Sequence, residues 1–498
     1  MATAAISSTK ARNFINGKWV DSGSKELFER RNPANIDEVV ARAPKSTREE
    51  MREAIAAAKT AFPGWRDTPA PVRGRVLNRA TALMESQKEE LARLLTREEG
   101  KTLKDSLGEV QKSINILEFM TGEARRLGGE TLPSELPRNF AYTVKCPLGV
   151  VGAITPWNFP ISIPVWKLAP ALVAGNTAVL KPAELTPLTA AAVVRIFEEA
   201  GLPPGVLNLV LGSGSEIGDE MVQHPDVRAL SFTGSNAIGS ALYAAGALKL
   251  KKCQCEMGGK NPIVVLEDAD LPLAVESAIF GAFGSAGQRC TATSRVIVED
   301  AVADPFVQML LDRTRMLKVG DGLAYGIDLG PVVDEKQLAT VLGYIEIGKK
   351  EAKLLVGGGQ LKGQGYDRGY FVAPTVFDEV PWDSMIAQDE IFGPVLSIIR
   401  VPDFDEAMRV ANSVQYGLSS SIYTNDATRV FDFIERIETG IVHVNSPTVG
   451  GEAQLPFGGM KGTGVGLREM GRVAVDFYTE IKAVYIDYTG QKRQTSLY

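Results

Sequence analysis

Cys290 is the residue of this sequence best suited to act as a nucleophile. Its segment reads Gly-Gln-Arg-Cys-Thr over residues 287–291, so small neighbours let a substrate approach and a cationic neighbour favours the thiolate. A lone cysteine is also a common buried apolar residue, and these residues alone leave both readings open. The neighbouring Arg289 and Thr291 are therefore of interest only if Cys290 reacts.

Glu256 is the expected partner of such a nucleophile. The chain has two histidines, His224 and His443, and we expect both to be structural. Ser-His and Cys-His machinery and most zinc sites require a histidine, so this scarcity argues against them and against a bound metal. Glu256 opens Glu-Met-Gly-Gly-Lys-Asn-Pro (residues 256–262), a run suited to a tight turn. Without a histidine, such a carboxylate is the natural general base.

Asn158 could stabilise an oxyanion. It lies in Thr-Pro-Trp-Asn-Phe-Pro (residues 155–160), where two prolines fix a bend after a predicted strand. Its side-chain amide is then available to donate a hydrogen bond to developing negative charge. A structural asparagine turn is the alternative.

Two glycine clusters could approach a phosphate. Residues 212–218 miss the dinucleotide spacing G-x-G-x-x-G by one residue, which is weak evidence. Residues 232–235 (Phe-Thr-Gly-Ser) end a predicted strand and open a predicted helix, where N–H groups and the helix dipole could receive a pyrophosphate. An ordinary strand-to-helix turn is the alternative. Gly100-Lys101-Thr102 is not expected to bind phosphate, because Leu95 stands where a P-loop needs glycine.

The elements that must position these residues predict an α/β protein. Short apolar runs recur from residue 150 with helical or turn-rich segments between them, which is typical of parallel sheets. The predicted strands of a first block are 150–154, 178–180, 207–211 and 229–232. Those of a second block are 263–266, 296–298, 395–399, 420–423 and 441–444, with helices at 405–412 and 427–437. Residues 46–99 are predicted to be helical, with capping boxes at Ser46 and Ser86.

Two strand-like segments, 140–145 and 481–488, lie outside both blocks. A strand at the margin of a domain needs a partner edge. We expect these two to pair into a small antiparallel sheet that also takes part in oligomerisation.

Composition narrows the class of protein further. The 498 residues carry 54 Lys plus Arg against 60 Asp plus Glu, so nucleic acid is not an expected partner. Four scattered cysteines indicate free thiols and a cytoplasmic enzyme. No secretory signal is predicted, and four prolines argue against a membrane span in the uncharged segment 146–166.

Taken together, these segments resemble the aldehyde dehydrogenase superfamily from about Asn13 to Tyr488. The motifs that carry the resemblance are 156–160, 181–184, 232–235, 256–260, 287–290, 390–394 and 456–461. The resemblance implies a Rossmann-like cofactor domain (1–128 and 147–259), an α/β catalytic domain (260–472) and oligomerisation strands (129–146 and 473–498). It also implies a homodimer or homotetramer.

The resemblance further implies a covalent mechanism with NAD or NADP as cofactor. Cys290 adds to an aldehyde, Asn158 and the Cys290 N–H hold the oxyanion, and Glu256 deprotonates the water that cleaves the thioester. The cofactor-binding residues implied are Thr155, Pro156, Trp157, Lys181, Glu184, Gly214, Phe232, Thr233, Gly234, Ser235, Glu390 and Phe392. The substrate-binding residues implied are Phe159, Trp166, Arg289, Thr291 and Phe457. Glu184 favours NAD over NADP, although the adjacent Lys181 leaves NADP open.

One departure from the common pattern lies at residues 466–469, where the chain holds one residue more before Glu469. The role of Glu469 as a second acid is therefore open. With the arginine before Cys290, this variant is similar to bacterial dehydrogenases of 2-oxoglutarate semialdehyde, with succinate semialdehyde as the alternative substrate. Arg289 and Thr291 are the expected contacts of a distal carboxylate, with Arg125 and Arg126 in reserve. A structural ion pair is the alternative for Arg289.

Two other classes of function share this fold. A coenzyme-A-acylating dehydrogenase would replace water by a thiol, and the presence of Glu256 argues against it. A non-catalytic binding protein would be expected to lack Cys290, Glu256 or Asn158, and all three are present.

Overall fold

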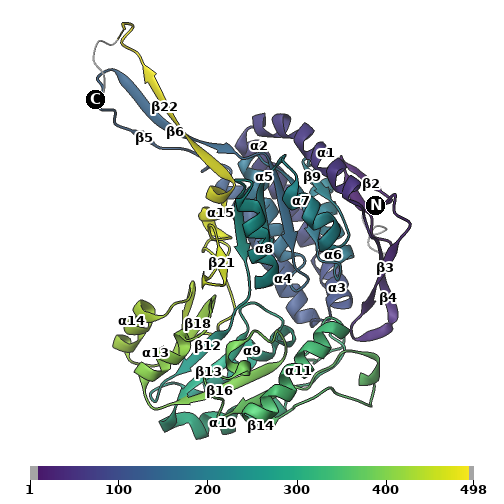
Figure 1. The fold of residues 1–498 in the computed structure, drawn as a ribbon, viewed down its shortest axis with the longest axis vertical. Helices are drawn as coiled ribbons and strands as arrows, with labels where there is room; N and C mark the ends of the chain where they lie inside the picture. Colours follow the sequence, from purple (N-terminus) through teal and green to yellow (C-terminus); the bar gives the residue numbers. More distant parts are fainter. Residues whose placement is uncertain (1–8, 493–498) are drawn as a thin grey trace.

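Two largely parallel β-sheets, each flanked by helices, occupy the upper and lower parts of the structure, a computed structural model that describes residues 9–492, in the view of Figure 1. The first sheet has eight strands in the order β2-β1-β9-β8-β7-β10-β11-β21. The second has seven, in the order β14-β15-β16-β13-β12-β18-β19. The predicted α/β class is therefore confirmed.

The first sheet is parallel at its centre and antiparallel at both edges. Its strands are β1 (Asn13–Ile15), β2 (Lys18–Val20), β7 (Val150–Thr155), β8 (Thr177–Pro182), β9 (Leu207–Leu209), β10 (Val227–Thr233), β11 (Lys252–Glu256) and β21 (Gly464–Val465). The four predicted runs are the four strands β7 to β10. β21 joins this sheet from within the range 260–472 that the sequence assigned to the second domain, and the domain boundaries stay predictions.

The second sheet is parallel except for its edge strand β14. Its strands are β12 (Asn261–Val265), β13 (Thr293–Glu299), β14 (Lys353–Val356), β15 (Thr375–Asp378), β16 (Val395–Val401), β18 (Ser419–Tyr423) and β19 (Ile441–Val444). All five predicted runs are strands here. Most of their residues are buried on both faces, which explains why they read as continuous apolar runs.

The N-terminal helices are α1 (Arg48–Asp67), α2 (Ala70–Ser86), α3 (Lys88–Glu99) and α4 (Leu103–Glu123). The predicted capping boxes are wrong. Thr47, not Ser46, caps α1 and exchanges hydrogen bonds with Glu50, because the hydroxyl of Ser46 bonds the buried Asn13 instead. Ser86 ends α2, and its hydroxyl donates to the carbonyl of Leu83 rather than capping α3.

The remaining helices complete the layers. They are α5 (Ser162–Ala174), α6 (Pro187–Glu199), η1 (Gly214–Gly218), α7 (Asp219–Gln223), α8 (Asn236–Ala247), α9 (Leu271–Phe283), η2 (Gly284–Gly287), α10 (Asp300–Arg315), α11 (Glu335–Glu351), η3 (Tyr366–Arg368), α12 (Met385–Gln388), α13 (Phe404–Asn412), α14 (Ala427–Arg436) and α15 (Gly471–Phe477). The two helices predicted in the second block are α13 and α14. Among the helices of residues 9–492, none combines the length and the apolar character needed to cross a membrane.

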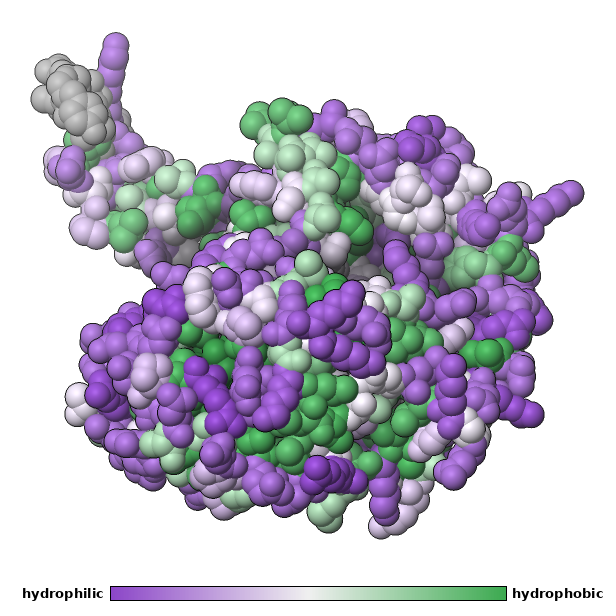
Figure 2. Space-filling view, turned by 60° about the horizontal axis from the view of Figure 1, so that its bottom comes forward, coloured by the Kyte–Doolittle hydropathy of each residue, from purple (hydrophilic) through white to green (hydrophobic). Residues whose placement is uncertain are grey.

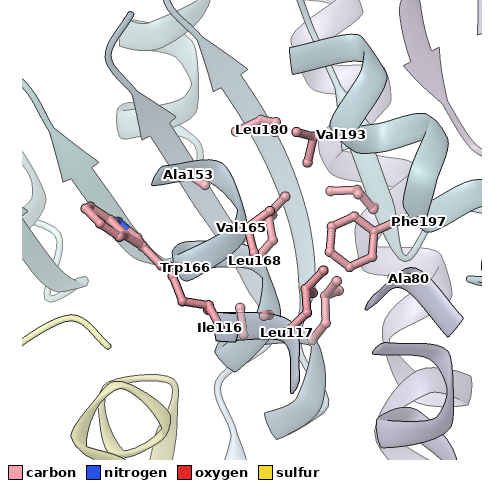
Figure 3. Packing of buried hydrophobic residues seen from close by; sticks show 14 of the residues in the cluster. Ala80, Ile116, Leu117, Ala153, Val165, Trp166, Leu168, Leu180, Val193 and Phe197 are labelled. Carbon is pink, nitrogen blue, oxygen red and sulfur yellow. The ribbon is translucent and has the colours of Figure 1, made fainter. Parts of the chain in front are cut away.

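Helix α5 lies at the centre of the main core, and all its residues are buried. Figure 3 shows Val165 and Leu168 of α5 packed beside Leu117 of α4 and Phe197 of α6. Trp166, a member of the same cluster, extends from α5 to the side away from Phe197. The core thus holds α4 and α5 in place, and the Trp166 ring lies on a different side of α5 from Phe197.

A narrow three-stranded sheet projects from the body as an arm (Figures 1 and 2). Its strands are β5 (Thr131–Leu132), β6 (Asn139–Pro147) and β22 (Thr479–Asp487), in the order β22-β6-β5. β6 and β22 pair antiparallel along their whole length, so the predicted pairing of the two marginal segments is confirmed. Two short pairs complete the strands: β3 (Leu27–Asn32) with β4 (Asn35–Pro44), and β17 (Tyr416–Gly417) with β20 (Met460–Lys461).

Candidate active site

Four parallel strands of the first sheet end next to the residues singled out from the sequence. Thr155, the last residue of β7, pairs with Pro182 of β8, and Thr233, the last of β10, pairs with Glu256 of β11. Parallel strands present their carboxyl ends at one edge, and ligands of open α/β sheets bind outside that edge. The topology therefore collects segments that lie far apart in the sequence.

Lys181 and Glu184 lie at the end of β8. Lys181 is buried, and its Nζ donates to the carbonyl of Pro182 at 3.2 Å. Burial lowers the pKa of Lys181, and the charge of Glu184 opposes that shift. Glu184 itself is exposed. Gly218, the last residue of η1, which begins at Gly214, lies beside this lysine: a Cβ there would be in ordinary contact with the Lys181 side chain, at 4.0 Å.

The turn after β10 leads into helix α8. Gly234 has no room for a side chain, since a Cβ would lie 2.6 Å from the ring of Phe232. Ser235 occupies the N-cap of α8 but makes no side-chain hydrogen bond to the helix. Among the described residues, the buried hydroxyls of Thr155 and Thr233 have no hydrogen-bond partner. This edge therefore holds polar groups that the protein itself leaves unsatisfied.

Two further expected residues come from the segment after α12. The ring of Phe392 meets Trp157 edge-on, with centroids 5.4 Å apart. The carboxylate of Glu390 accepts from the backbone N–H of Gly259 at 2.9 Å, and burial raises the pKa of Glu390 to about 7. The structure thus brings residues 390–392 to the loops after β7 and β11.

Cys290 follows a tight turn built from η2. Ser285, Ala286 and Gly287 all have positive φ, of 52°, 55° and 70°. A Cβ at Gly287 would lie 2.2 Å from the carbonyl oxygen of Gly393, so only glycine fits there. The glycine of the Gly-Gln-Arg-Cys segment therefore has a backbone role.

Two asparagine side chains fasten the segment around Cys290. Asn158, which is 5% exposed, donates from Nδ2 to the carbonyl of Gln288 at 3.0 Å. Asn261 donates to the carbonyls of Cys290 and Ala292 at 2.8 and 2.9 Å. An amide nitrogen has two hydrogens, so one N–H of Asn158 is left to donate to another acceptor. Asn158 is therefore within reach of the turn that carries Cys290.

The electrostatic setting of Cys290 differs from the sequence expectation. The pKa of its thiol is raised to about 12, chiefly by burial and also by the charges of Glu390 and Glu256, and the charge of Lys112 opposes this rise. Arg289 does not supply the expected thiolate-stabilising charge. Its guanidinium forms a 2.7 Å ion pair with Asp105, in which both side chains are largely buried.

Glu256 ends β11 with its carboxylate enclosed among glycines. A Cβ at Gly458 would lie 2.4 Å from one carboxylate oxygen, and a Cβ at Gly464 would lie 3.2 Å from the other. Burial raises the pKa of Glu256 well above its usual range, and the nearby charge of Glu469 adds to the rise. Its Oε2 has no hydrogen-bond partner among the described residues. A raised pKa makes this carboxylate a stronger base than a solvated glutamate.

A cavity of about 990 Å³ opens onto Cys290. All five residues expected to contact a substrate line it: Phe159, Trp166, Arg289, Thr291 and Phe457. The rings of Trp166 and Phe457 lie 5.1 Å apart and form an apolar wall. The cavity is large enough for a short organic molecule.

Comparison with known proteins agrees with this arrangement. The model of the aldehyde dehydrogenase family matches residues 19–484. The chain belongs to that family. It is 48% identical to 2,5-dioxopentanoate dehydrogenase of Saccharolobus solfataricus, over 96% of this chain and 99% of that protein. It is 46% identical to alpha-ketoglutaric semialdehyde dehydrogenase of Bacillus subtilis, over 95% of this chain and 97% of that protein.

A solved aldehyde dehydrogenase has the same fold. The crystal structure of betaine aldehyde dehydrogenase from Staphylococcus aureus in complex with NAD+ superposes with a TM-score of 0.95 at 35% identity. It covers 98% of this chain and 97% of that one. The resemblance noted from the motifs is thus confirmed, and the chain is an NAD(P)-dependent aldehyde dehydrogenase.

In this aldehyde dehydrogenase the extra residue before Glu469 does not remove its carboxylate from the interior. Glu469 is 2% exposed and pairs with the ammonium of Lys167. Its backbone exchanges hydrogen bonds with Phe457 at 2.6 and 2.8 Å. Glu469 therefore lies close enough to raise the pKa of Glu256.

Arg125 and Arg126, the second pair of arginines that the sequence suggested for the distal carboxylate, lie away from the cavity at Cys290. Arg125 and Arg126 follow the end of α4 and are exposed, and Arg126 pairs with Glu123. Neither lines the cavity at Cys290. Two residues that the sequence did not single out do contribute there: Lys112, a cavity-lining cation, and Asn261. Asn261 lies directly after the 256–260 motif and before a proline, a position that could have marked it.

Proposed function

We propose that this aldehyde dehydrogenase oxidises a short aldehyde with a distal carboxylate, with 2-oxoglutarate semialdehyde as the preferred substrate. The observation that carries the proposal is the cavity at Cys290, with an aromatic wall from Trp166 and Phe457 and a cation at Lys112. The names of the two relatives cited above support the substrate class. Succinate semialdehyde is the alternative.

Cys290 is the proposed nucleophile. Its sulfur, as thiolate, adds to the aldehyde carbon, and the carbonyl oxygen becomes an oxyanion. The remaining N–H of Asn158 and the backbone N–H of Cys290 donate hydrogen bonds to that oxyanion. Loss of hydride from the same carbon then leaves a thioester on Cys290, so one difficult oxidation is divided into two easier steps.

Glu256 is the proposed base for the second half of the reaction. It takes a proton from water, which attacks the thioester carbon. The carbon–sulfur bond breaks, the carboxylic acid leaves and Cys290 is regenerated. The raised pKa of Glu256 suits this task, because a higher pKa makes the carboxylate a stronger base towards the proton of water.

The residues at the carboxyl edge of the first sheet fit a nicotinamide dinucleotide, which when bound supplies the hydride acceptor. The free N-terminus of α8 and the unsatisfied hydroxyls of Thr155 and Thr233 suit phosphate and other acceptors. Lys181 and the exposed Glu184 suit ribose hydroxyls. Because Glu184 would repel a 2′-phosphate, we propose that NAD is preferred over NADP.

The cell compartment and assembly are also proposals. All four cysteines are free of disulfides, which supports a reducing compartment such as the cytoplasm. The projecting arm supports a homodimer or homotetramer.

A panel of aldehydes tests the proposal. Pure enzyme is incubated with NAD or NADP and with 2-oxoglutarate semialdehyde, succinate semialdehyde or pentanal, with and without coenzyme A, and reduced cofactor is followed by absorbance. We expect the highest kcat/KM for 2-oxoglutarate semialdehyde with NAD, and no requirement for coenzyme A. Cys290→Ala should abolish turnover, whereas Cys253→Ala, a buried thiol outside the cavity, should retain most of it.

Two results would contradict the proposal. Equal kcat/KM for pentanal and for the charged semialdehyde would reject the substrate class. Full turnover by Cys290→Ala would reject the nucleophile.

A further inference from the structure

One face of helix α4 forms a wall of the cavity that opens onto Cys290. The α4 residues that line it follow helical spacing: Lys104, Asp105, Gly108, Glu109, Gln111, Lys112, Asn115, Glu118 and Phe119. Lys112 lies in the middle of this face, between the exposed ends at Lys104 and Glu118. Its side chain therefore enters the cavity from the wall rather than from the mouth.

The ammonium of Lys112 faces two aromatic rings. Its Nζ lies 5.0 Å from the ring centroid of Trp166 and 5.4 Å from that of Phe457. A lysine can interact favourably with ring faces at this distance, which holds the ammonium against the apolar wall. The same wall leads to Cys290, because all these residues line one cavity.

Lys112 has no anionic partner within residues 9–492, where it forms no ion pair and no hydrogen bond. The other cations near the cavity floor are already engaged. Lys101 pairs with Glu109 at 2.8 Å, and Arg289 pairs with Asp105 at 2.7 Å. Lys112 is thus the cation of the cavity interior that remains available to a ligand.

Two features of this part of the cavity favour an anion. Burial lowers the pKa of Lys112 to about 8; Cys290, Glu109 and Glu469 raise it, and Arg289 lowers it. A carboxylate beside the ammonium would offset the burial cost of its charge. The indole Nε1 of Trp166 is also buried without an acceptor among the described residues, and a ligand oxygen could satisfy it.

We propose that Lys112 is the residue that binds the distal carboxylate of the substrate and so determines the preference for semialdehydes over neutral aldehydes. This inference rests on the proposed function. The aldehyde carbon lies at Cys290, the carbon chain lies along Trp166 and Phe457, and the carboxylate meets the Lys112 ammonium. Arg289, the candidate from the sequence, keeps its structural pair with Asp105.

The test compares a charged and a neutral substrate of equal chain length in matched variants. Lys112→Met keeps most of the aliphatic stem and removes the charge, and Lys112→Arg keeps the charge. Arg125→Met removes an exposed cation that follows the end of α4 and does not line the cavity. For 2-oxoglutarate semialdehyde, kcat/KM of Lys112→Met should fall about 10- to 150-fold, mainly through KM. For pentanal it should change less than threefold.

The two controls separate a contact from a general charge effect. Lys112→Arg should retain most of the preference for the charged substrate, and Arg125→Met should retain all of it. Equal losses for both substrates in Lys112→Met would show a structural role and overturn the inference, as would an equal loss in Arg125→Met.

The outcome also separates this inference from the proposed function. If wild type prefers the semialdehyde and Lys112→Met keeps that preference, Lys112 is wrong and the function stands. If wild type shows no preference for the charged aldehyde, the proposed substrate class fails, and the inference fails with it.

Discussion

Two buried carboxylates, Glu256 and Glu469, lie in one region of the interior with the charges of Arg468 and Lys167 nearby. Lys167 pairs with Glu469, and Glu256 has no ion pair within the described chain. Like charges at close range disfavour simultaneous ionisation, so the pKa of Glu256 is raised by Glu469 in addition to burial. The extra residue at 466–469 thus leaves Glu469 able to tune the proposed base.

This coupling predicts a pH dependence. The proposed base acts only when Glu256 is deprotonated, and its raised pKa places that form at higher pH, so deacylation should slow as pH falls through this pKa. Glu469→Gln removes the repelling charge and leaves the attraction of Arg468 and Lys167, so the pKa of Glu256 should fall. The acidic limb of the kcat profile should therefore move to lower pH. Stopped-flow and steady-state rates from pH 5 to 9 measure it.

Glu256→Gln is the matched control. It should give a burst of reduced cofactor and then a steady state slower by about 10²- to 10⁴-fold, with no acidic limb from this group. A slow first turnover without a burst would place Glu256 before hydride loss. An acidic limb that stays in place or moves to higher pH in Glu469→Gln would contradict the coupling.

At the scale of residues, the sequence predicted which segments come together but not the direction of every side chain. The motifs named Cys290, Asn158 and Glu256 as one site, and in the structure each lies at a turn or at the end of a strand that the topology fixes; their catalytic roles stay predictions. Arg289 could not be oriented from its neighbours, since Asp105, its partner, lies 184 residues earlier in the chain. Lys112 stands in an ordinary amphipathic helix, and no pattern shows which of its polar residues face a cavity.

At the scale of elements, the junction between α3 and α4 supports the loop that carries Asn158. Gly100 ends α3 with a φ of 106°, and Thr102 caps α4. Between them, the buried Lys101 pairs with Glu109 of α4 and also donates to the carbonyl of Asn158. Glu109 in turn accepts from two backbone N–H groups at the start of α5. The Gly-Lys-Thr segment therefore has a structural role, not a phosphate-binding one.

A buried pair of this kind predicts an asymmetric response to mutation. Lys101→Met leaves the Glu109 carboxylate buried without its partner, which typically costs about 3–5 kcal/mol. Lys101→Met/Glu109→Gln removes both charges and keeps an amide oxygen for the α5 N–H groups. The thermal unfolding midpoint should therefore fall further in the single variant than in the double one.

Calorimetry on wild type, both single variants and the double variant measures this difference. If the double variant is destabilised by the sum of the two single effects, Lys101 and Glu109 are not coupled. A loss of turnover in Lys101→Met that is rescued in the double variant would further indicate that the pair positions Asn158.

Sequence patterns predict the long buried strands of this fold but not its short edge strands or the exact helix cap. Long apolar runs such as 150–154 and 395–399 were predicted as strands because burial on both faces leaves a clear signal. The edge strands β1, β2 and β21 have two or three residues each, too few for any periodicity. The capping box was misplaced by one residue because Ser46 and Thr47 are both good caps, and a contact with the distant Asn13 decided between them.

At the scale of the whole molecule, the arm is the part that projects from the body and packs least against the rest of the chain. It is a three-stranded sheet that projects from the body, with β22 at one edge and β5 at the other (Figure 1). Ile481 and Tyr485 of β22 are 72% and 73% exposed. They are four residues apart, so they lie on the same face of the strand. Small sheets with an uncovered apolar face are marginally stable, and burial against another copy would stabilise this one.

The arm therefore predicts an oligomer that depends on β22. Wild type should have at least twice the 53.6 kDa mass of the chain in light scattering coupled to size exclusion. Ile481→Glu/Tyr485→Glu places two charges on the apolar face without breaking the backbone pairing to β6, and the mass should fall towards that of the monomer. Tyr325→Glu, at a fully exposed tyrosine of the body, is the matched control and should leave the mass unchanged. A monomeric wild type, or a double variant of unchanged mass, would contradict an assembly role for the arm.

Because the cavity at Cys290 is formed by this chain's own residues, a monomeric variant that stays folded should retain turnover, which separates assembly from catalysis.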